Sequence, residues 1–408
     1  MNEFRERTVL EVARAAGVDA DEVRVVVSPY RVCPIGAHVD HQGGPMLGMA
    51  IDAHTLLAYA PTADGRVALA SSDYEGEVAF DLMGVATDVP EPHWGVYARG
   101  AARLFAEAAP EARRGLVGRV AGALPGSGLS SSASVLLAYL AALADVNAAT
   151  LSPHERVALS RRVENEIVGV ASGILDPASI TGARRGELLF IDSAAETWTS
   201  HALGGGAEMP RVLVAFTGIE RRLATSGFND RVDECHRAAE GLFDAAGLAP
   251  PPGRRARLGD LDDAVFETHA AALTDALARR ARHFFGERER VLAGLDDWKR
   301  GDLERFGERM KASCESSLHQ YETGSEELAR LQAILVSTRG VYGARFSGGG
   351  FGGCSIALVE PAQATAAAGS VAERFARACP DLEPRMRVFL VDSDDGVRIE
   401  SADGSVIS

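Results

Sequence analysis

The sequence is poor in cysteine. Its five cysteines are scattered through 408 residues without a CxxC pair: Cys33, Cys235, Cys314, Cys354 and Cys379. Spacings of this kind do not favour a disulfide framework or a cysteine-rich metal site. They indicate a protein that keeps its thiols reduced, so we expect a cytoplasmic location.

Positive charge is also scarce, because 42 Lys and Arg stand against 57 Asp and Glu, for a net charge of −15. Nucleic-acid binding requires a basic face, so this balance argues against a nucleic-acid partner, whereas a pocket for a small anion remains compatible with it. No apolar run approaches the roughly 18–20 residues that span a bilayer, so we expect no membrane partner. Residues 1–17 predict an amphipathic helix rather than a signal peptide.

The chain lacks internal repeats, and its length favours two domains. The glycine-rich segment 201–210 lies between two expected strands, which places an N-terminal domain at 1–200 and a C-terminal domain at 210–408. The mixed strands and helices indicate an α+β fold rather than a doubly wound sheet. Strands are expected at 25–27, 48–60, 66–70, 77–80, 117–123, 187–192, 211–218, 354–360 and, as the last strand, 386–392. Helices are expected at 94–108, 134–146, 153–171, 229–247, 260–284, 286–298, 301–318, 325–338 and 364–379.

A phosphate-binding loop is predicted at 125–133, where PGSGLSSSA lies between an expected strand and an apolar helix. Glycines allow a close backbone approach to phosphate, hydroxyls supply hydrogen bonds, and the helix N-terminus adds free N–H groups with a positive dipole end. The loop is not a Walker A motif, because GxxxxGK[ST] is absent. A Ser/Gly linker that caps a helix is the plainer alternative, but linkers do not usually sit tightly between a strand and a strongly apolar helix.

A second loop, Ser28 to Gly44, is expected to follow a short strand, and its segment RVCPIGAHVDHQGG crowds a cation, two histidines and a carboxylate together. By itself such a loop is more often a solvated turn. A zinc site from His38, Asp40 and His41 is conceivable, but neighbouring ligands on one short loop rarely close a tetrahedron.

The third loop, YGARFSGGGFGGC, places five glycines within the six positions 348–353. Ordering so many glycines is entropically costly, which makes sense where backbone must line a ligand. The alternative for this loop alone is a flexible hairpin.

Taken together, the three loops resemble the galactokinase-type GHMP kinases over nearly the full length of the chain. RVCPIGAHVDHQGG is similar to the galactokinase signature GRxNLIGEHTDYNGG, PGSGLSSSASV to the ATP loop, and YGARFSGGGFGGC to the third motif. The segment ENEIVGVASGILDPAS is similar to the one that carries a metal-binding Glu and a catalytic Asp. The resemblance implies a two-domain GHMP fold with the active site in the cleft between the domains.

The resemblance also implies residue roles and two cofactors, ATP and Mg²⁺. Asp176 is expected to be the catalytic base beside the C1 hydroxyl, with Arg31 against it and the transferring phosphoryl group. Ser132 and Glu164 are expected to be magnesium ligands, although Glu164 beside two arginines would by itself fit a surface ion pair. The expected ATP contacts are Trp94, which alone would fit a core position, and Gly126, Ser127, Gly128, Leu129, Ser130, Ser131, Ser132, Ala133, Gly348, Gly349 and Gly350.

On the sugar side, His38 and Asp40 match sugar-binding positions, with Asp40 expected on ring hydroxyls. Ala37 stands where galactokinases usually have a Glu, which is expected at the C6 hydroxyl of the sugar. Phe228 stands where a sugar-contacting Tyr is usual, and YETGS at 321–325 replaces YEVSC. Loss of the acid makes room for a substrate carboxylate at C6 and removes like-charge repulsion.

These departures resemble galacturonokinases, so we expect C1 phosphorylation of a galactose-type sugar with galacturonic acid favoured. D-galactose is the alternative substrate. Arg221 and Arg222 are candidates for a cation that pairs with the carboxylate. A non-catalytic sugar sensor on the same fold is a different class of function, but the intact SSSA stretch, Glu164 and Asp176 argue against it. The largely intact first motif disfavours homoserine- or mevalonate-type kinases.

Overall fold

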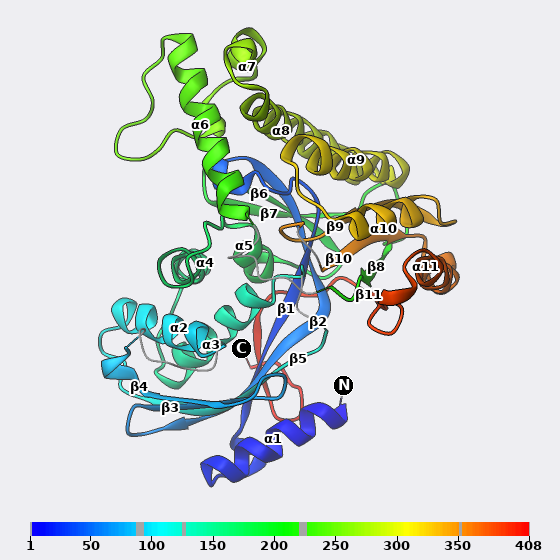
Figure 1. The fold of residues 1–408 in the computed structure, drawn as a ribbon. Coiled ribbons are helices and arrows are strands. Elements are labelled where there is room, and N and C mark those ends of the chain that lie inside the picture. The colour runs from blue at the N-terminus through cyan, green and yellow to red at the C-terminus, as the bar shows by residue number, and fades with distance from the viewer. Residues whose placement is uncertain (1, 87–93, 125–127, 220–226, 351–352, 408) are drawn as a thin grey trace.

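A computed structural model describes residues 2–86, 94–124, 128–219, 227–350 and 353–407, which form two β-sheets with helices packed on both faces of each (Figure 1). Within these residues no helix has the length and apolar character needed to cross a membrane. Antiparallel pairing dominates both sheets, and β3 and β5 make the parallel pair in the first. The expected α+β class is confirmed.

The first sheet has the strand order β12-β1-β2-β5-β3-β4, and β6 extends it from β2 and is followed by β7. Its long central strands β1 and β2 are antiparallel neighbours. They pair along almost the whole of β1, from Arg24 with Tyr59 to Ile35 with Leu47. The bounds are β1 Arg24–Ile35, β2 Pro45–Thr62, β3 Arg66–Ser71, β4 Glu77–Asp81, β5 Gly115–Gly122, β6 Glu187–Asp192, β7 Thr197–Ala202 and β12 Arg398–Ser401.

Alternation along β1 places different side chains on the two faces of this sheet. Val25 and Val27 pack under α1, whereas Val26 packs in the large core that α2 and α3 share with the sheet. Helix α3 is apolar on nearly all sides and is correspondingly buried. The helices of this half are α1 Asn2–Ala16, α2 Gly95–Ala108, α3 Ser131–Val146, α4 Pro153–Arg162 and α5 Leu175–Gly182.

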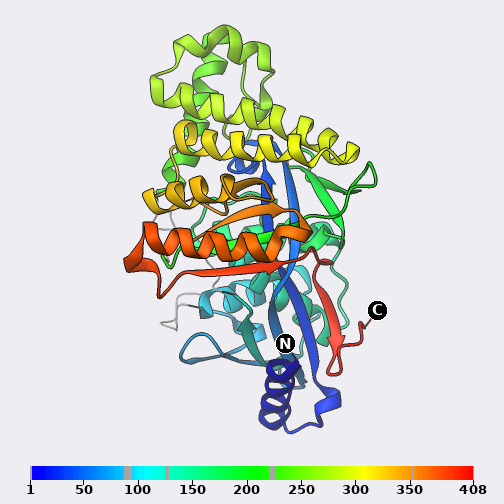
Figure 2. The same ribbon diagram turned by 90° about the vertical axis from the view of Figure 1, so that its right-hand side faces the viewer.

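The second sheet has the order β11-β8-β10-β9 and is covered on both faces (Figure 2). Along β8, Leu213 and Ala215 face α10 and α11, whereas Val212 and Val214 face a core built with α8 and α9. The strand bounds are β8 Arg211–Phe216, β9 Val341–Phe346, β10 Cys354–Val359 and β11 Arg387–Val391. The helix bounds are α6 Phe228–Ala246, α7 Asp263–His269, α8 Asp275–Arg300, α9 Leu303–Ser316, α10 Glu326–Val336 and α11 Ala364–Ala378.

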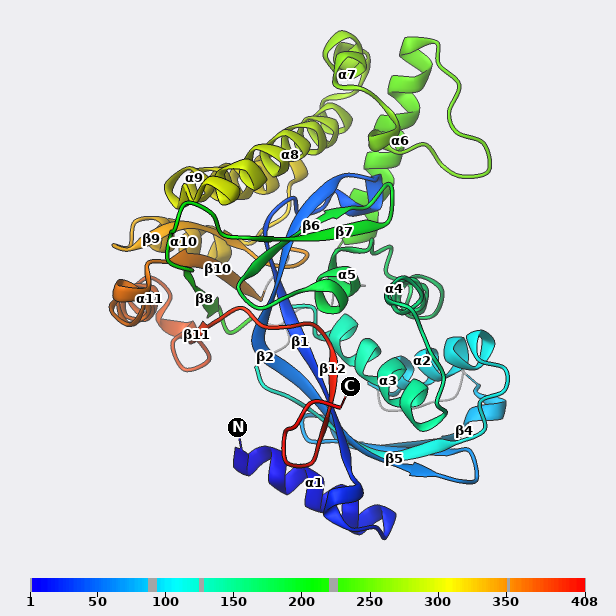
Figure 3. The ribbon, with the colours of Figure 1, turned by 180° about the vertical axis from the view of Figure 1, so that it is seen from behind.

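The last strand was not anticipated. After β11, the chain leaves the second sheet, passes α5 and pairs as β12 with β1 of the first sheet (Figure 3). The prediction that 386–392 is the final strand is therefore wrong. The division into domains at 1–200 and 210–408 stays a prediction. The C-terminal strand β12 belongs to the predicted second domain by sequence but pairs with β1 of the first.

Three further corrections concern where elements begin and end. The short strand expected at 25–27 extends to Ile35, so half of the expected loop from Ser28 is a strand that β2 pairs and buries. The boundary expected between helices 260–284 and 286–298 is wrong. The helical segment is instead interrupted at residues 270–274, and Asp275–Arg300 is one continuous helix. The helix expected at 153–171 ends at Arg162 and passes into a π-helical turn, Val163–Val168.

Candidate active site

Arg31 lies at the point where the three sequence motifs meet. It extends from β1 and is only 3% exposed. Its Nε donates to Asp176 Oδ1 at 2.7 Å, and its Nη1 lies 3.3 Å from the carbonyl oxygen of Gly128 and 3.4 Å from Ser347 Oγ. One buried guanidinium thereby contacts the expected catalytic base, the expected phosphate loop and the glycine-rich third loop.

The surroundings of Arg31 fix its position and its charge. The backbone N–H of Arg31 donates to the carbonyl of Leu129 at 3.2 Å, which ties β1 to the loop before α3. Burial opposes the charged guanidinium, but the charge and hydrogen bond of Asp176 outweigh it and raise the pKa of Arg31. The Asp176 side chain, in the first turn of α5, is 26% exposed and is therefore reachable by a ligand.

The expected magnesium ligands also come together. Ser132 Oγ, in the first turn of α3, donates to Glu164 Oε1 at 2.8 Å, and Ser172 Oγ donates to Glu164 Oε2 at 2.6 Å. Burial and the nearby charge of Asp176 raise the pKa of Glu164 to about 7. A buried carboxylate beside a hydroxyl supplies the hard oxygen ligands that Mg²⁺ prefers, and Mg²⁺ usually takes only one or two carboxylates plus phosphates and water.

The two glycine-containing loops touch each other. A Cβ added to Gly128, whose φ is +91°, would lie 2.7 Å from the carbonyl oxygen of Ser347, and one added to Gly348 would lie 2.8 Å from the Cα of Gly128. Both positions therefore need glycine for space. Ser130 adopts a left-handed φ of 63° immediately before α3, and its Oγ is buried without a protein partner. Gly126 and Ser127 lie outside the described residues.

On the other side of Arg31, His38 is held in a fixed orientation. Its ring is stacked on Tyr321 with centroids 4.6 Å apart, and its Nε2 lies 3.1 Å from the carbonyl of Gly348. Because a carbonyl only accepts, Nε2 carries the hydrogen and Nδ1 is left as a buried acceptor without a protein partner. Burial and the nearby His283 and Arg345 lower the pKa of His38 well below its ordinary value, so the ring is neutral.

Asp40 lies beside the helix start that carries Asp176, the expected catalytic base. The backbone N–H at Leu175 donates to Asp40 Oδ2 at 3.2 Å, which places this carboxylate at the start of the helix that carries Asp176. A Cβ on Gly173 would come within 2.3 Å of the Asp40 carboxyl group, so glycine is required there for space. Burial, together with the charge of Asp176, raises the pKa of Asp40.

Ala37 and Phe228 give this side of the site an apolar character. Ala37 is 6% exposed and packs in the core below the loop. Phe228 opens α6, and its ring lies 6.5 Å from that of His38 and 6.1 Å from that of His41. The structure therefore brings the four expected sugar positions together. Arg221 and Arg222 lie outside the described residues.

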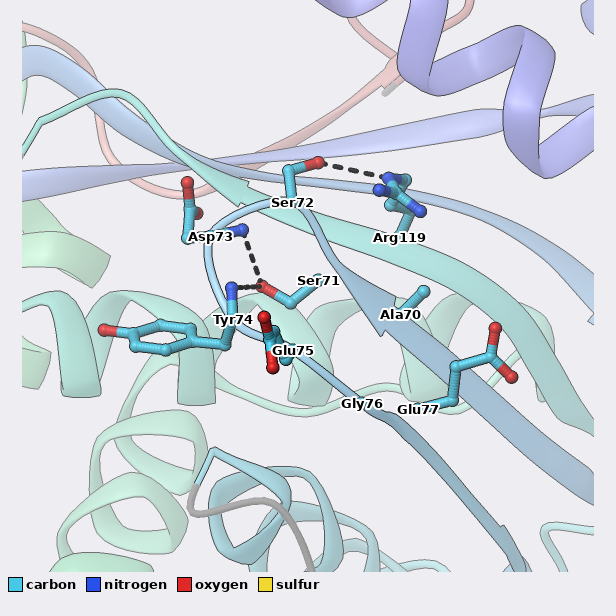
Figure 4. Close-up of a pocket in the computed structure, with 9 residues that line it drawn as sticks. All are labelled: Ala70, Ser71, Ser72, Asp73, Tyr74, Glu75, Gly76, Glu77 and Arg119. Carbon is cyan, nitrogen blue, oxygen red and sulfur yellow. Dashed lines mark hydrogen bonds between the residues drawn. The ribbon is translucent and has the colours of Figure 1, made fainter.

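Trp94 lies in the core just before α2, with 6% of its surface exposed, and its Nε1 donates to the carbonyl of Glu75 at 3.2 Å. That bond fixes the β3–β4 turn, which lines an open hollow together with Arg119 (Figure 4). In the same turn Asp73 accepts from the backbone N–H of Gly122, three residues before the expected phosphate loop. A contact of Trp94 with ATP stays a prediction.

Sequence reasoning missed the residues that support the site from behind. Ser172 and Ser347 bind Glu164 and Arg31, yet single serines in loops carry no distinctive pattern. The zinc alternative receives no support, because the part of the chain that the structure describes holds no group of three ligands suited to a metal ion. His41 instead lies 3.1 Å from Tyr321 Oη. Other residues that contact the expected site residues or their loops, and to which no role was assigned from the sequence, are Gly173, His283, Glu287, Ser313, Tyr321 and Arg345.

Comparison with known proteins agrees with this arrangement. Three family models match: the GHMP kinases N terminal domain at residues 96–183, the GHMP kinases C terminal at 293–377, and the galactokinase galactose-binding signature at 14–61. The chain is 39% identical to a galacturonokinase of Arabidopsis thaliana, over 95% of this chain and 96% of that protein. It is 33% identical to a galactokinase of Thermococcus kodakarensis, over 92% and 99% of the respective chains.

The fold agrees as well. The crystal structure of Lactococcus lactis galactokinase complexed with galactose superimposes with a TM-score of 0.86 at 28% identity, covering 95% of this chain and 98% of that one. A mevalonate kinase structure at 19% identity has a TM-score of 0.61 and shares the fold alone. By its motifs, its fold and its similarity to these relatives along almost its whole length, the chain belongs to the galactokinase family of the GHMP kinases.

Proposed function

We propose that this protein transfers the γ-phosphoryl group of Mg²⁺-ATP to the anomeric hydroxyl of a galactose-type sugar, with galacturonic acid as the preferred acceptor. The observation that carries the proposal is the 2.7 Å pair of Arg31 and Asp176, set between the loop before α3 and the glycine-rich third loop. The Asp176 carboxylate can accept a proton, while the guanidinium of Arg31 adds positive charge where phosphoryl oxygens would lie.

The chemistry requires little covalent participation by the protein. As the sugar oxygen attacks the γ-phosphorus, the bond to the bridging oxygen of ADP breaks, and the hydroxyl proton passes to Asp176. Catalysis of such a step is mainly positioning and charge stabilisation. Arg31 would orient Asp176, and the neighbouring Asp40 and His38 would hold sugar hydroxyls.

Ser132 and Glu164 are the residues that would hold Mg²⁺, because their oxygens are 2.8 Å apart and both suit a hard cation. When bound, the ion would neutralise charge on the phosphates. The N-terminus of α3, the positive end of the helix dipole, lies at the same position, which favours phosphate there.

The preference for galacturonate rests on Ala37. The galactokinase signature resembled by this loop has an acid at that position, and a galacturonokinase is among the relatives that match nearly the whole chain. An acid beside a uronate carboxylate would repel it, whereas alanine leaves an uncharged wall. D-galactose remains the competing acceptor, since galactokinases also match and one is known as a complex with galactose.

The test is a coupled assay of ATP turnover with galacturonate, galactose and about ten related sugars, followed by NMR assignment of the phosphorylated carbon. We expect the highest kcat/KM with galacturonate and a phosphate at C1. Higher kcat/KM with galactose would replace the proposal by an atypical galactokinase. Binding of sugar without any turnover would instead favour a sensor.

A further inference from the structure

The backbone of the sugar loop is held from behind by one helix. Glu287 and His283, one turn apart on α8, both reach this loop: Glu287 Oε2 accepts from the backbone N–H of Gly36 at 2.7 Å, and His283 Nε2 donates to the carbonyl of Ala37 at 3.0 Å. The next residue, His38, adopts a left-handed φ of 64°. Three successive residues that shape the predicted sugar pocket are therefore fixed by contacts outside the loop.

Glu287 is an unusual residue to find in this position, because its side chain is fully buried. Burial alone would raise its pKa, but the charges of Arg290, His283 and Arg345 outweigh that effect and lower it, so Glu287 is ionised. Its Oε1 accepts from Arg290 Nε at 2.6 Å, and its Oε2 accepts from Ser313 Oγ at 2.8 Å as well as from Gly36. A buried carboxylate with every contact satisfied is rigidly placed.

Ser313 connects this carboxylate to the third loop. Its Oγ also accepts from Nη1 of Arg345, a fully buried residue of β9 whose Nη2 donates to Ser317 Oγ at 3.2 Å and whose Nε donates to the carbonyl of Phe346 at 3.0 Å. Directly after Phe346 come Ser347 and the glycine-rich turn. The connection thus runs from Gly36 through Glu287, Ser313 and Arg345 to the start of that turn.

We propose that the buried Glu287–Ser313–Arg345 relay is a positioning device that sets the sugar loop in register with the glycine-rich loop and so determines acceptor affinity. The proposal rests on the proposed function for the identity of the acceptor. Arg31 also bonds Ser347, and His38 also bonds Gly348, so the two loops meet at the reacting centre as well as through the relay.

Stability alone is a poor reason for such a relay. Buried charged networks are often no more stabilising than apolar side chains of the same volume, although removal of one member leaves the others unsatisfied. What a relay of directional bonds provides is one fixed geometry. Here that geometry holds Gly36, where a Cβ would collide with Val291, Met46 and Pro45, and the left-handed His38 beside it.

The matched pair of variants Ser313→Ala and Ser317→Ala tests the relay. Both remove a fully buried hydroxyl that accepts from Arg345, but only Ser313 also bonds Glu287. We expect Ser313→Ala to raise the KM for the sugar by about tenfold or more, with the KM for ATP changed less than about threefold, because this variant alone breaks the connection between Glu287 and Arg345. Ser317→Ala should leave both KM values near those of the wild type.

A difference in sugar KM between the two serine variants separates positioning from folding, because a partly unfolded preparation lowers apparent kcat without changing KM. Glu287→Gln sharpens it, because the amide oxygen can still accept from Gly36 while the charge is lost; its sugar KM should lie between those of the wild type and Ser313→Ala. An equal rise in sugar KM for the two serine variants, or a change in kcat alone, would overturn the relay.

A readout without catalysis keeps the relay distinct from the proposed function. In hydrogen exchange, the amide of Gly36 should lose protection at least about tenfold in Ser313→Ala and keep it in Ser317→Ala. If the wild type phosphorylated no sugar, the proposed function would fail, and retained Gly36 protection in Ser313→Ala would then still overturn the relay.

Discussion

The two sides of the site are built on different principles. On the phosphoryl side, comprising Arg31, Ser132, Glu164 and Asp176, charged groups are paired directly and Asp176 stays partly open to solvent. On the expected sugar side, Ala37, His38, Phe228 and Tyr321 are buried and uncharged, and Asp40 adds a carboxylate at the start of α5. The His38 ring is held there by stacking on Tyr321. We infer from this difference that transfer of the phosphoryl group needs charges held at the centre, whereas selection of the acceptor depends on the absence of a charge at Ala37.

The strongest way to break the phosphoryl side is Asp176→Asn. This change keeps the shape and removes the proton acceptor, so we expect kcat to fall by about 10²- to 10⁴-fold, the usual contribution of a positioned base. Nucleotide binding, followed by fluorescence titration, should persist and serves as the control for folding. A variant with near wild-type turnover would remove Asp176 from the role of base.

The cost of burying charge on the phosphoryl side should appear in the pH dependence of stability. The folded-state pKa of Glu164 is about 7, against 4.5 as its ordinary value. Between these pH values the folded protein keeps a proton that the unfolded chain has lost, so stability falls as pH rises through this window and levels off above about 7. The contribution is up to about 3 kcal/mol at 1.36 kcal/mol for each pKa unit.

Glu164→Gln should flatten this dependence, as measured by urea unfolding at pH 5 and pH 8 with chelator present. Glu166→Gln is the matched control, because Glu166 lies in the same turn, is exposed and pairs with Arg162 at the surface. An equal slope in the wild type and Glu164→Gln would contradict the raised pKa.

Ala37→Glu tests the sugar side by giving it a charge. Two like charges about 4 Å apart repel by about 4 kcal/mol at an effective dielectric near 20, and movement of the side chain relieves part of this. We therefore expect the ratio of kcat/KM for galacturonate to that for galactose to fall by about a hundredfold. In the control Ala37→Gln, the glutamine side chain has nearly the size of glutamate but no charge, so this variant should change the ratio much less. Equal ratios in the two variants would show that size, not charge, decides.

Glu164→Ala should have the smallest effect, on the metal. Loss of one carboxylate ligand is expected to raise the Mg²⁺ concentration for half-maximal activity by about tenfold, because the phosphates and water still hold much of the coordination shell. Glu166→Ala is again the control. Superimposable magnesium titrations of Glu164→Ala and the wild type would exclude Glu164 as a ligand.

Prediction from the sequence succeeded best where a signal is local. The apolar run after Ser132 predicts a buried helix, and the amphipathic spacing of residues 1–17 predicts α1; both are confirmed. Prediction failed where long-range pairing decides. The extension of β1 to Ile35 depends on hydrogen bonds to β2, and β12 is a four-residue strand that pairs with β1, a strand far away in the sequence.

For the candidate site, the resemblance of the sequence to the galactokinase motifs is what pointed to Arg31, Ser132, Glu164 and Asp176. By itself, the local pattern around Glu164 fits a surface ion pair equally well. The tertiary structure alone decided their pairing, because residues 145 positions apart, such as Arg31 and Asp176, meet only when β1 passes the start of α5. The tertiary structure also decided the relay through Glu287. The burial and the partners of this residue depend on how α8 and α9 pack against the sugar loop. Such packing involves many side chains at once, so no local sequence pattern predicts it.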